Sequence, residues 1–327
     1  MYKQFSQDTP YCGVNPYIIQ VAKPILDETN FEMLFKFIVE RYKIHLKKDV
    51  WNQEPPWTND KILRDYRFTN VRREHDKETK WVINNIVFNK ALSYRDKILN
   101  IIAFRLFNKH ETFEIFGALN FDKDFDPEAY RRLFKEKSKK CPGYVFFTNA
   151  FFTSGMKRCI DKGISEEYVP VRVLKFVKKL ADSKIFTRIR NSKNQKEVFE
   201  VLTSYEGLGS FIAYQMFIDF TYIPEFPFTE DEFTVVGPGC KKGLNYVFKS
   251  LGGMTYEEAL FWLRDNIETE FFKRDFDWNP DALYQDIPDN SRYLSLMSLE
   301  NCHCELAKYI AVLNRTGRPR NLYKRST

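Results

Sequence analysis

Apolar residues recur at helical spacing along most of this chain, and this periodicity constrains its fold more than any other feature. One segment, 29–48, carries an apolar stripe of Phe31, Leu34, Phe35, Phe37, Ile38 and Tyr42, which predicts an amphipathic helix. The same spacing predicts helices at about 91–107, 126–138, 168–183, 194–204, 209–220, 239–250, 255–266 and 295–314. Strand-like stretches are short, at 82–88 and 144–147. We therefore expect a mainly α fold.

No internal repeat, low-complexity tract or glycine- and serine-rich linker divides the sequence. We expect residues 1–327 to form a single helical domain. Three loop-like segments, 49–59, 221–236 and 275–292, are long enough to carry functional residues. The basic tail, 316–327, is expected to fray or to contact a nucleic-acid backbone.

Composition narrows the classes of protein that fit. No run of about 18 apolar residues suits a membrane span, and the start lacks a signal-peptide pattern, so we expect no membrane partner and a cytoplasmic location. The net charge of +7 and the 17% aromatic content suit a nucleic acid, whose phosphates attract cations and whose bases stack on rings. A phenylalanine-rich core explains the aromatic content equally well.

The six cysteines stand at 12, 141, 159, 240, 302 and 304, without the spacing of a disulfide framework. We interpret them as reduced thiols. Cys302, His303 and Cys304 cluster as zinc ligands sometimes do, but only four histidines are present and no C-x-x-C. Buried cysteines are the preferred interpretation, and we predict no metal site.

The common catalytic motifs are missing from the sequence. It contains no P-loop G-x-x-x-x-G-K-[ST], no G-x-G-x-x-G, no H-E-x-x-H, no G-x-S-x-G and no zinc-deaminase signature. The missing P-loop argues against a P-loop kinase or ATPase.

Two glycines, Gly207 and Gly209, precede the apolar helix predicted at 209–220. A G-x-G turn before a helix exposes backbone N–H groups beside the positive end of the helix dipole, where a DNA phosphate can bind. This is the pattern of helix-hairpin-helix modules. A turn that simply joins two helices and needs a positive φ is the alternative.

A second constellation follows the hairpin. Asp231 stands 22 residues after Gly209 and precedes Gly237-Pro238-Gly239, which is followed by Lys241 and Lys242. Glycine permits close approach, proline fixes one dihedral angle and the lysines supply charge, so this element suits a second anion site. A tight loop with two solvated lysines is the alternative. The hairpin and this element form the predicted functional core, about 200–250.

A third constellation lies upstream, where arginines alternate with aromatic residues between 64 and 76. Arg67 and Arg73 suit a bidentate phosphate clamp, and Tyr66 or Phe68 could stack on a base. Arg73 and Asp76 are three residues apart and could pair on one helical face. A solvated helix with internal salt bridges is the alternative.

These motifs occur in an order that resembles a known family. The order is W-T-x-D, Y-R-F-T-N-V-x-R-x-x-D, G-x-G-x-F-x-A-Y-Q-x-x-x-D, E-x-x-F-x-x-x-G-P-G-x-x-x-G and finally the segment 298–309. It resembles the α-glutamyl/putrescinyl thymine pyrophosphorylase family, whose domain is also called the helical domain of 5-hydroxymethyldeoxyuridine (5-hmdU) DNA kinases. The resemblance covers about residues 55–315.

The resemblance implies a helix-hairpin-helix, DNA-glycosylase-like helical fold and a role in thymine hypermodification of bacteriophage DNA. It implies that pyrophosphate on 5-pyrophosphoryloxymethyluracil, made by a kinase, is displaced by an amino acid or a polyamine. The partners would be double-stranded DNA, the amine and that kinase. No cofactor is required, although magnesium could accompany pyrophosphate.

Roles follow for the residues that match the motifs. Arg67, Arg73 and Lys242 would bind the pyrophosphate, and Asp231 would orient or deprotonate the amine. Gln215 and Asp219, four residues apart on one helical face, would read the uracil edge or support Asp231. The catalytic candidates are Asp231, Arg73, Arg67 and Asp219. The substrate- and DNA-binding candidates are Phe68, Asn70, Asp76, Asn149, Gly207, Gly209, Gln215, Gly237, Pro238, Gly239, Lys241 and Lys242.

Two other functions stay open from the sequence. A DNA glycosylase acting on a modified base would use the same fold and the same placement of Asp231. A non-catalytic DNA-binding subunit of the modification machinery would need the basic residues but no carboxylate. The sequence does not identify the amine, the target context or the oligomeric state.

Overall fold

The computed structural model describes residues 23–121, 125–148, 164, 166–279, 294–317 and 322–323. The α-helices are α1 Glu28–His45, α2 Lys61–Asp65, α3 Lys77–Val82, α4 Tyr94–Phe107, α5 His110–Phe116, α6 Pro127–Lys140, α8 Val169–Ala181, α9 Ile185–Arg190, α10 Gln195–Thr203, α11 Ser210–Phe220, α12 Pro238–Val247, α13 Tyr256–Phe272 and α15 Leu296–Leu313. Strands β1, Ile25–Leu26, and β2, Phe248–Ser250, form one antiparallel pair. The prediction of a mainly α fold is confirmed.

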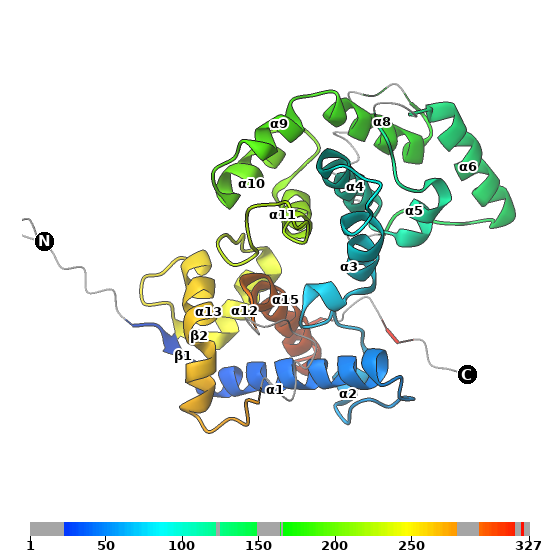
Figure 1. The fold of residues 1–327 in the computed structure, drawn as a ribbon. Coiled ribbons are helices and arrows are strands. Elements are labelled where there is room, and N and C mark those ends of the chain that lie inside the picture. Colours follow the sequence, from blue (N-terminus) through cyan, green and yellow to red (C-terminus); the bar gives the residue numbers. More distant parts are fainter. Residues whose placement is uncertain are drawn as a thin grey trace, which may run out of the picture.

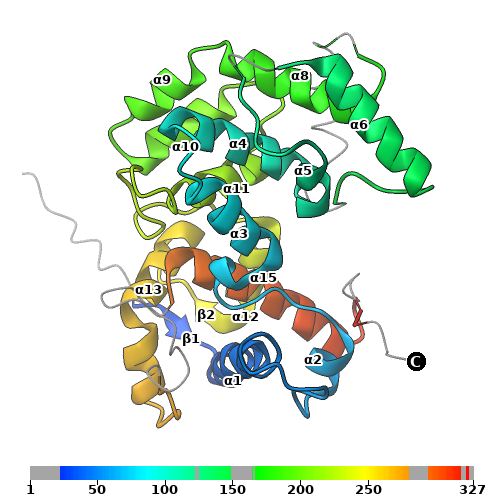
Figure 2. The ribbon, with the colours of Figure 1, turned by 45° about the vertical axis from the view of Figure 1, so that its right-hand side comes forward.

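The described helices form two lobes, each with its own hydrophobic core (Figure 1). The central lobe is formed by the described residues between about 82 and 235, and its core is built mainly from α4, α8, α10 and α11. The terminal lobe combines 23–71 with 236–279 and 294–317, so that α1 packs on α12 and α15, which come much later in the sequence. The two lobes can still be told apart, one above the other, when the view is turned (Figure 2).

The chain crosses between the lobes twice. The first crossing, residues 72–81, includes the 3₁₀ turn Arg73–His75 and most of α3. The second crossing is residues 227–237, which contain no helix or strand. The N-terminal end of α15 also reaches the boundary, because Met297 packs in the core of the central lobe. We call the two crossings and the side chains that contact them the interlobe seam.

Local sequence explains where several helices begin. Asp27 caps α1, since its carboxylate accepts a hydrogen bond from the backbone N–H of Asn30 at 3.0 Å. Thr255 and Glu258 form a reciprocal capping box at α13. Proline occupies the first turn of α12, where its missing N–H removes no helical hydrogen bond.

The predicted extended piece at 82–88 is wrong. Residues Ile83–Val87 form a π-helical turn that continues α3. Its β-branched residues resemble a strand in sequence, but Ile86 and Val87 share one buried face, and burial decides the conformation. At 144–147 the described chain is irregular and contains no strand. The short helices α2, α3, α5 and α9 were not predicted.

Within the described ranges, each helix is either too short or too polar to span a bilayer.

Candidate functional site at the interlobe seam

A buried ion network connects the first crossing to the central lobe. Arg73 lies in the 3₁₀ turn, Asp219 in α11 and Arg105 in α4. The Oδ1 atom of Asp219 accepts from Nη2 of Arg73 at 2.9 Å and from Nη2 of Arg105 at 2.9 Å. A further bond joins Nε of Arg105 to Oδ2 of Asp219. Because all three side chains are buried, the network fixes the seam to the core.

Polar groups around the network accept further hydrogen bonds from the two guanidinium groups. Arg73 also donates to the side-chain and backbone oxygens of Gln215, and Arg105 donates to Thr79 at 3.0 Å and Asn108 at 2.6 Å. Burial lowers the pKa of Arg105 despite the nearby Asp219. Burial also acts to lower the pKa of Arg73. The attraction of Asp219 and other negative groups outweighs burial, so the pKa of Arg73 is raised. The network thus places two guanidinium groups on one carboxylate, and the partly buried Asp76 is a further carboxyl group whose charge acts on Arg73.

Three predicted site residues, Arg73, Gln215 and Asp219, therefore meet in one network. Gln215 and Asp219 do share a helical face, as their spacing predicts, and both contact Arg73. Sequence reasoning missed Arg105. Its signal was a single arginine inside the apolar run of α4, IIAFRLF, because a charge on a buried helical face requires a partner.

The second crossing brings two carboxyl groups to the seam. Burial, reinforced by the negative charge of Glu74, raises the pKa of Glu230 to about 7, although a hydrogen bond with Ser295 opposes this shift. The carboxylate of Asp231 accepts from the backbone N–H of Leu296, the first residue of α15, at 2.8 Å. Asp231 thus attaches α15 to the second crossing.

Two further carboxyl groups lie where α15 and the first crossing meet. Burial raises the pKa of Glu300 to about 7, against the effects of the Gly237 N–H and Arg73. Burial raises the pKa of Asp76 to about 6, although its Oδ1 accepts from the backbone N–H of Asn70 at 3.0 Å. Of the residues predicted for binding, Asn70, Asp76 and Gly237 thus lie at or beside the seam.

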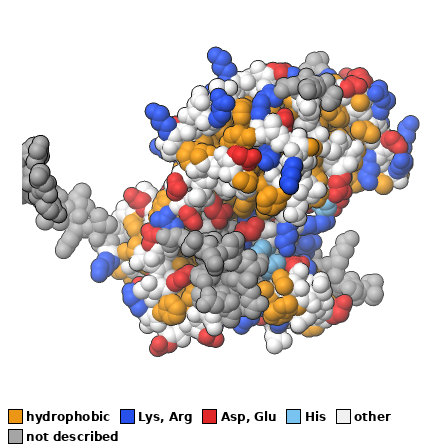
Figure 3. All heavy atoms as spheres, in the orientation of Figure 1, with side chains coloured by type: hydrophobic (Ala, Val, Ile, Leu, Met, Phe, Trp, Pro, Cys, Tyr) orange, Lys and Arg blue, Asp and Glu red, His pale blue; other side chains and the backbone are white. Residues whose placement is uncertain are grey.

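The seam is also charged on the molecular surface. On the face shown in Figure 3, acidic, basic and histidine side chains gather at the waist between the two lobes. Carboxyl groups with near-neutral pKa values beside fixed cations are typical of sites that transfer protons.

The Gly237-Pro238-Gly239 element has a packing role. Gly237 caps α12, and a Cβ atom at Gly239 would lie 2.5 Å from Sγ of Cys304. Lys241 and Lys242 are exposed on α12, and Nζ of Lys241 lies 4.8 Å from the ring centre of Tyr256. The glycines thus permit contact between α12 and α15, while the lysines face solvent.

The predicted hairpin joins α10 to α11. Gly207 has a φ of 101°, which favours glycine, and Gly209 caps α11 with no atom within 4 Å of a Cβ placed there. Phe211, in the first turn of α11, is 53% exposed. The hairpin turn is therefore open enough for a polymer backbone to approach.

Other predicted site residues lie apart from the network. The guanidinium of Arg67 lies 5.8 Å from the ring centre of Tyr323. Phe68 packs edge-on against Phe37 with ring centres 5.6 Å apart, which places it in the packing of the terminal lobe. Asn149 lies outside the described residues.

The cysteine cluster of α15 has partners within the protein. Sγ of Cys302 accepts from Arg41 at 3.4 Å, and Nδ1 of His303 is 2.7 Å from the carbonyl oxygen of Leu299. In the same helix, Lys308 pairs with the buried Glu305 at 2.5 Å. The described part of the chain holds a different group with metal-ligand spacing: Glu78, His110 and Glu111.

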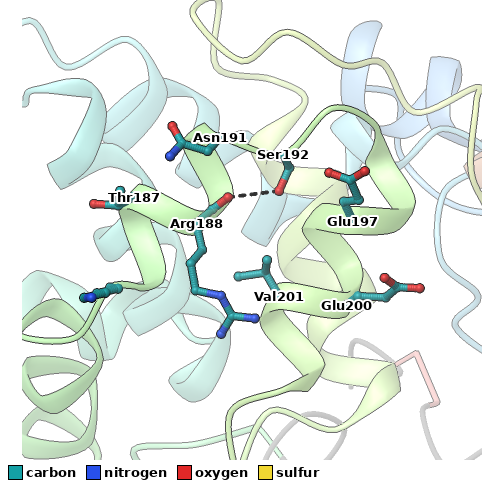
Figure 4. A pocket seen from close by; sticks show the side chains of 8 residues that line it. Thr187, Arg188, Asn191, Ser192, Glu197, Glu200 and Val201 are labelled. Atoms are coloured by element: carbon teal, nitrogen blue, oxygen red, sulfur yellow. Dashed lines mark hydrogen bonds between the residues drawn. The ribbon is translucent and has the colours of Figure 1, made fainter.

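An open groove of about 380 Å³ separates α9 from α10 (Figure 4). Its lining side chains are Lys184, Thr187, Arg188, Asn191, Ser192, Glu197, Glu200 and Val201. None of these residues belongs to the seam.

Replacing Glu300 by glutamine should change how stability depends on pH. The raised pKa of this carboxyl means that the folded state binds its proton more tightly than the unfolded state. Its contribution to stability is therefore complete below about pH 4.5 and is lost as pH rises through 7. Relative to the wild type, the variant should gain about 1–3 kcal/mol in free energy of unfolding between pH 5 and pH 8.

Urea unfolding at each pH measures this difference. The exposed Glu54→Gln is the control and should follow the wild-type curve. Parallel curves for wild type and Glu300→Gln would contradict the buried, proton-binding state of Glu300.

Comparison with known protein families identifies the family of this chain. The family described as "5-hmdU DNA kinase, helical domain" matches residues 28–317. The chain belongs to this 5-hmdU DNA kinase helical-domain family. The match includes both lobes and the seam between them, so the described site lies inside the family domain.

A 5-hmdU DNA kinase of Bacillus phage SP10 is 28% identical to this helical-domain protein over 298 residues. The alignment covers 88% of this chain but 46% of the phage protein, so the chain spans about half the length of that curated relative. No solved structure matches. The resemblance seen in the sequence is thus confirmed for the family, while the displacement of pyrophosphate stays a prediction.

Proposed function

We propose that this protein displaces pyrophosphate from 5-pyrophosphoryloxymethyluracil in DNA with an amine, giving a hypermodified thymidine. The observation that carries the proposal is the pair of buried guanidinium groups, Arg73 and Arg105, that share the single carboxylate of Asp219. Guanidinium groups that are fixed in place stabilise the negative charge that develops as pyrophosphate leaves. Since the sequence has no P-loop motif, we assign this step and not the kinase step.

The other predicted residues take roles around this centre. The hairpin glycines, with Lys241 and Lys242, bind phosphates of the DNA in a helix-hairpin-helix, glycosylase-like manner. Asp231 orients the reacting groups through its bond to α15, and Arg67 contacts DNA outside the seam. The target base is extruded toward the seam, because its 5-methylene carbon must reach the reactants. The partners are modified double-stranded DNA, an amine and the kinase that makes the substrate, in the host cytoplasm.

Nucleoside mass spectrometry tests this proposal. DNA carrying 5-pyrophosphoryloxymethyluracil is incubated with the protein and a mixture of amino acids and polyamines. We expect an amine-bearing thymidine and one released pyrophosphate per modified base. Arg73→Lys should lower product formation by about 100-fold or more, because lysine cannot reproduce the forked contacts.

The exposed Arg132→Lys is the matched control and should keep full activity. Unchanged substrate in every mixture would refute the transferase. A second candidate, a DNA glycosylase, is favoured by the position of Asp231 at a seam between two helical lobes, and abasic sites in the same sample would support it.

A further inference from the structure

Three side chains with metal-binding groups meet where the first crossing contacts the central lobe. Glu78 lies in α3, and His110 and Glu111 are the first two residues of α5. Nδ1 of His110 is 3.0 Å from Oε1 of Glu78 and 3.3 Å from Oε2 of Glu111. Glu78 stands 32 residues before His110, so no short motif joins them in the sequence and the fold brings them together.

Hydrogen bonding alone does not fully account for this arrangement. A ring nitrogen carries at most one proton, and that proton cannot point at two carboxylate oxygens at once. A cation between the three atoms would instead accept a lone pair from each. Ligands about 2.0–2.1 Å from a tetrahedral zinc ion lie about 3.3 Å apart. The two separations from Nδ1, 3.0 and 3.3 Å, are close to this value, and one ligand atom from each residue lies within 4.8 Å of the other two.

The second oxygen of each carboxylate is held by another group. Oε2 of Glu78 accepts from the backbone N–H of His110 at 2.8 Å, and Oε1 of Glu111 accepts from Nζ of Lys77 at 3.1 Å. Outer contacts of this kind orient the ligands in metal sites. The two oxygens that face Nδ1 are therefore fixed in direction.

The charge and the exposure of this cluster suit a divalent cation. With a neutral imidazole, the two carboxylates outweigh the ammonium group of Lys77, so the cluster is negative. The side chains of His110, Glu78 and Glu111 are 11%, 26% and 41% exposed, so an ion can enter from solvent and keep a water ligand. One imidazole nitrogen with two carboxylate oxygens favours zinc over magnesium, which is usually bound through oxygen ligands.

We propose that Glu78, His110 and Glu111 form a zinc site in which a water molecule completes the tetrahedron. The ion joins α3 to α5 and so fixes the first crossing on the central lobe. Thr79, next to Glu78, accepts from Arg105 of the buried network at 3.0 Å, so that α3 is attached to the central lobe at two points. The role of the ion is structural and does not depend on the displacement reaction.

Calorimetric titration of the metal-free chain with Zn²⁺ tests the site. The wild type should bind one equivalent saturably, and excess Mg²⁺ should not compete. Glu78→Gln and Glu111→Gln keep a side-chain oxygen but lose the charge, while His110→Gln removes the ring nitrogen. Each should weaken zinc binding by about 10–100-fold or more, because a lost ligand costs at least as much as a lost outer contact. Glu114→Gln, exposed on the same helix, is the matched control and should bind as the wild type does.

Two further measurements identify the ligands and the role of the ion. Co²⁺ in place of Zn²⁺ should give visible d–d bands without the near-ultraviolet charge-transfer band of a thiolate ligand, which separates this site from the cysteines. Zinc should also slow amide hydrogen exchange in α3 and α5, since it stabilises the contact between them. Glu111→Gln should lose this protection, and Glu114→Gln should keep it.

Three results would overturn the zinc site: no saturable zinc binding, equal binding by the wild type and all three ligand variants, or a thiolate band in the Co²⁺ form. Zinc binding that depends on the three residues but protects no amide in α3 would support the site and refute its structural role. Thermal unfolding of each variant without metal checks that it is folded.

Discussion

Replacing Asp219 by asparagine should lower the free energy of unfolding by about 3–5 kcal/mol. The change leaves Arg73 and Arg105 buried beside each other without their shared counter-charge. Repulsion between two desolvated guanidinium groups then adds to the loss of charged hydrogen bonds. Urea unfolding monitored by circular dichroism measures the effect.

The exposed Asp182→Asn supplies the comparison. Asp182 pairs with Lys178 one helical turn away on the surface of α8, and its loss should cost less than about 1 kcal/mol. Equal effects of the two substitutions would mean that the Asp219 network contributes no more than a surface ion pair.

Replacing Gly243 by alanine should destabilise the terminal lobe by about 3 kcal/mol or more. A Cβ atom at Gly243 would lie 2.6 Å from the carbonyl carbon of His303, so the backbones of α12 and α15 must separate. At a solvent-exposed position within a helix, the same change would stabilise the protein by about 1 kcal/mol. Packing against α15 therefore turns an expected stabilisation into a destabilisation. Because the first residue of α15, Leu296, binds the Asp231 carboxylate, product formation should fall as well.

Gly209→Ala is the control for this clash, since a Cβ atom there meets nothing within 4 Å. Alanine is less favourable than glycine at the N-cap of a helix, so this change should lower the free energy of unfolding by about 1 kcal/mol at most. Urea unfolding measures both variants. Equal unfolding midpoints for Gly243→Ala and Gly209→Ala would contradict the close contact between α12 and α15.

The sequence predicted the helices well because their apolar periodicity is a local property. The predicted segments 29–48, 209–220 and 295–314 agree with α1, α11 and α15 to within about three residues. The strand-like 82–88 was wrong because β-branched residues fit a buried helical face when neighbours cover it. Periodicity alone cannot show such cover, which depends on segments far away in the chain.

The candidate site was also predictable in part, because helical spacing is a local property of the sequence. The i, i+4 spacing placed Gln215 and Asp219 on one face, but Arg105, which binds Asp219, lies 114 residues before it. Motif order drew attention to Asp231, whereas a buried carboxyl oxygen without a hydrogen-bond partner among the described residues, Oε2, belongs to its neighbour Glu230. Which groups these two adjacent carboxylates bind, Ser295 for Glu230 and Leu296 for Asp231, depends on where α15 begins, and that is a tertiary contact.

The division of the terminal lobe between the two ends of the chain has a consequence for synthesis on the ribosome. The apolar stripe of α1 is buried against α12 and α15, which begin about 190 and about 250 residues after α1 ends. The contiguous central lobe can complete its core first, while α1 must wait with Phe31 and Leu34 uncovered. We expect the nascent chain to depend on holdase chaperones during this interval, and most strongly when translation pauses after the central lobe has emerged.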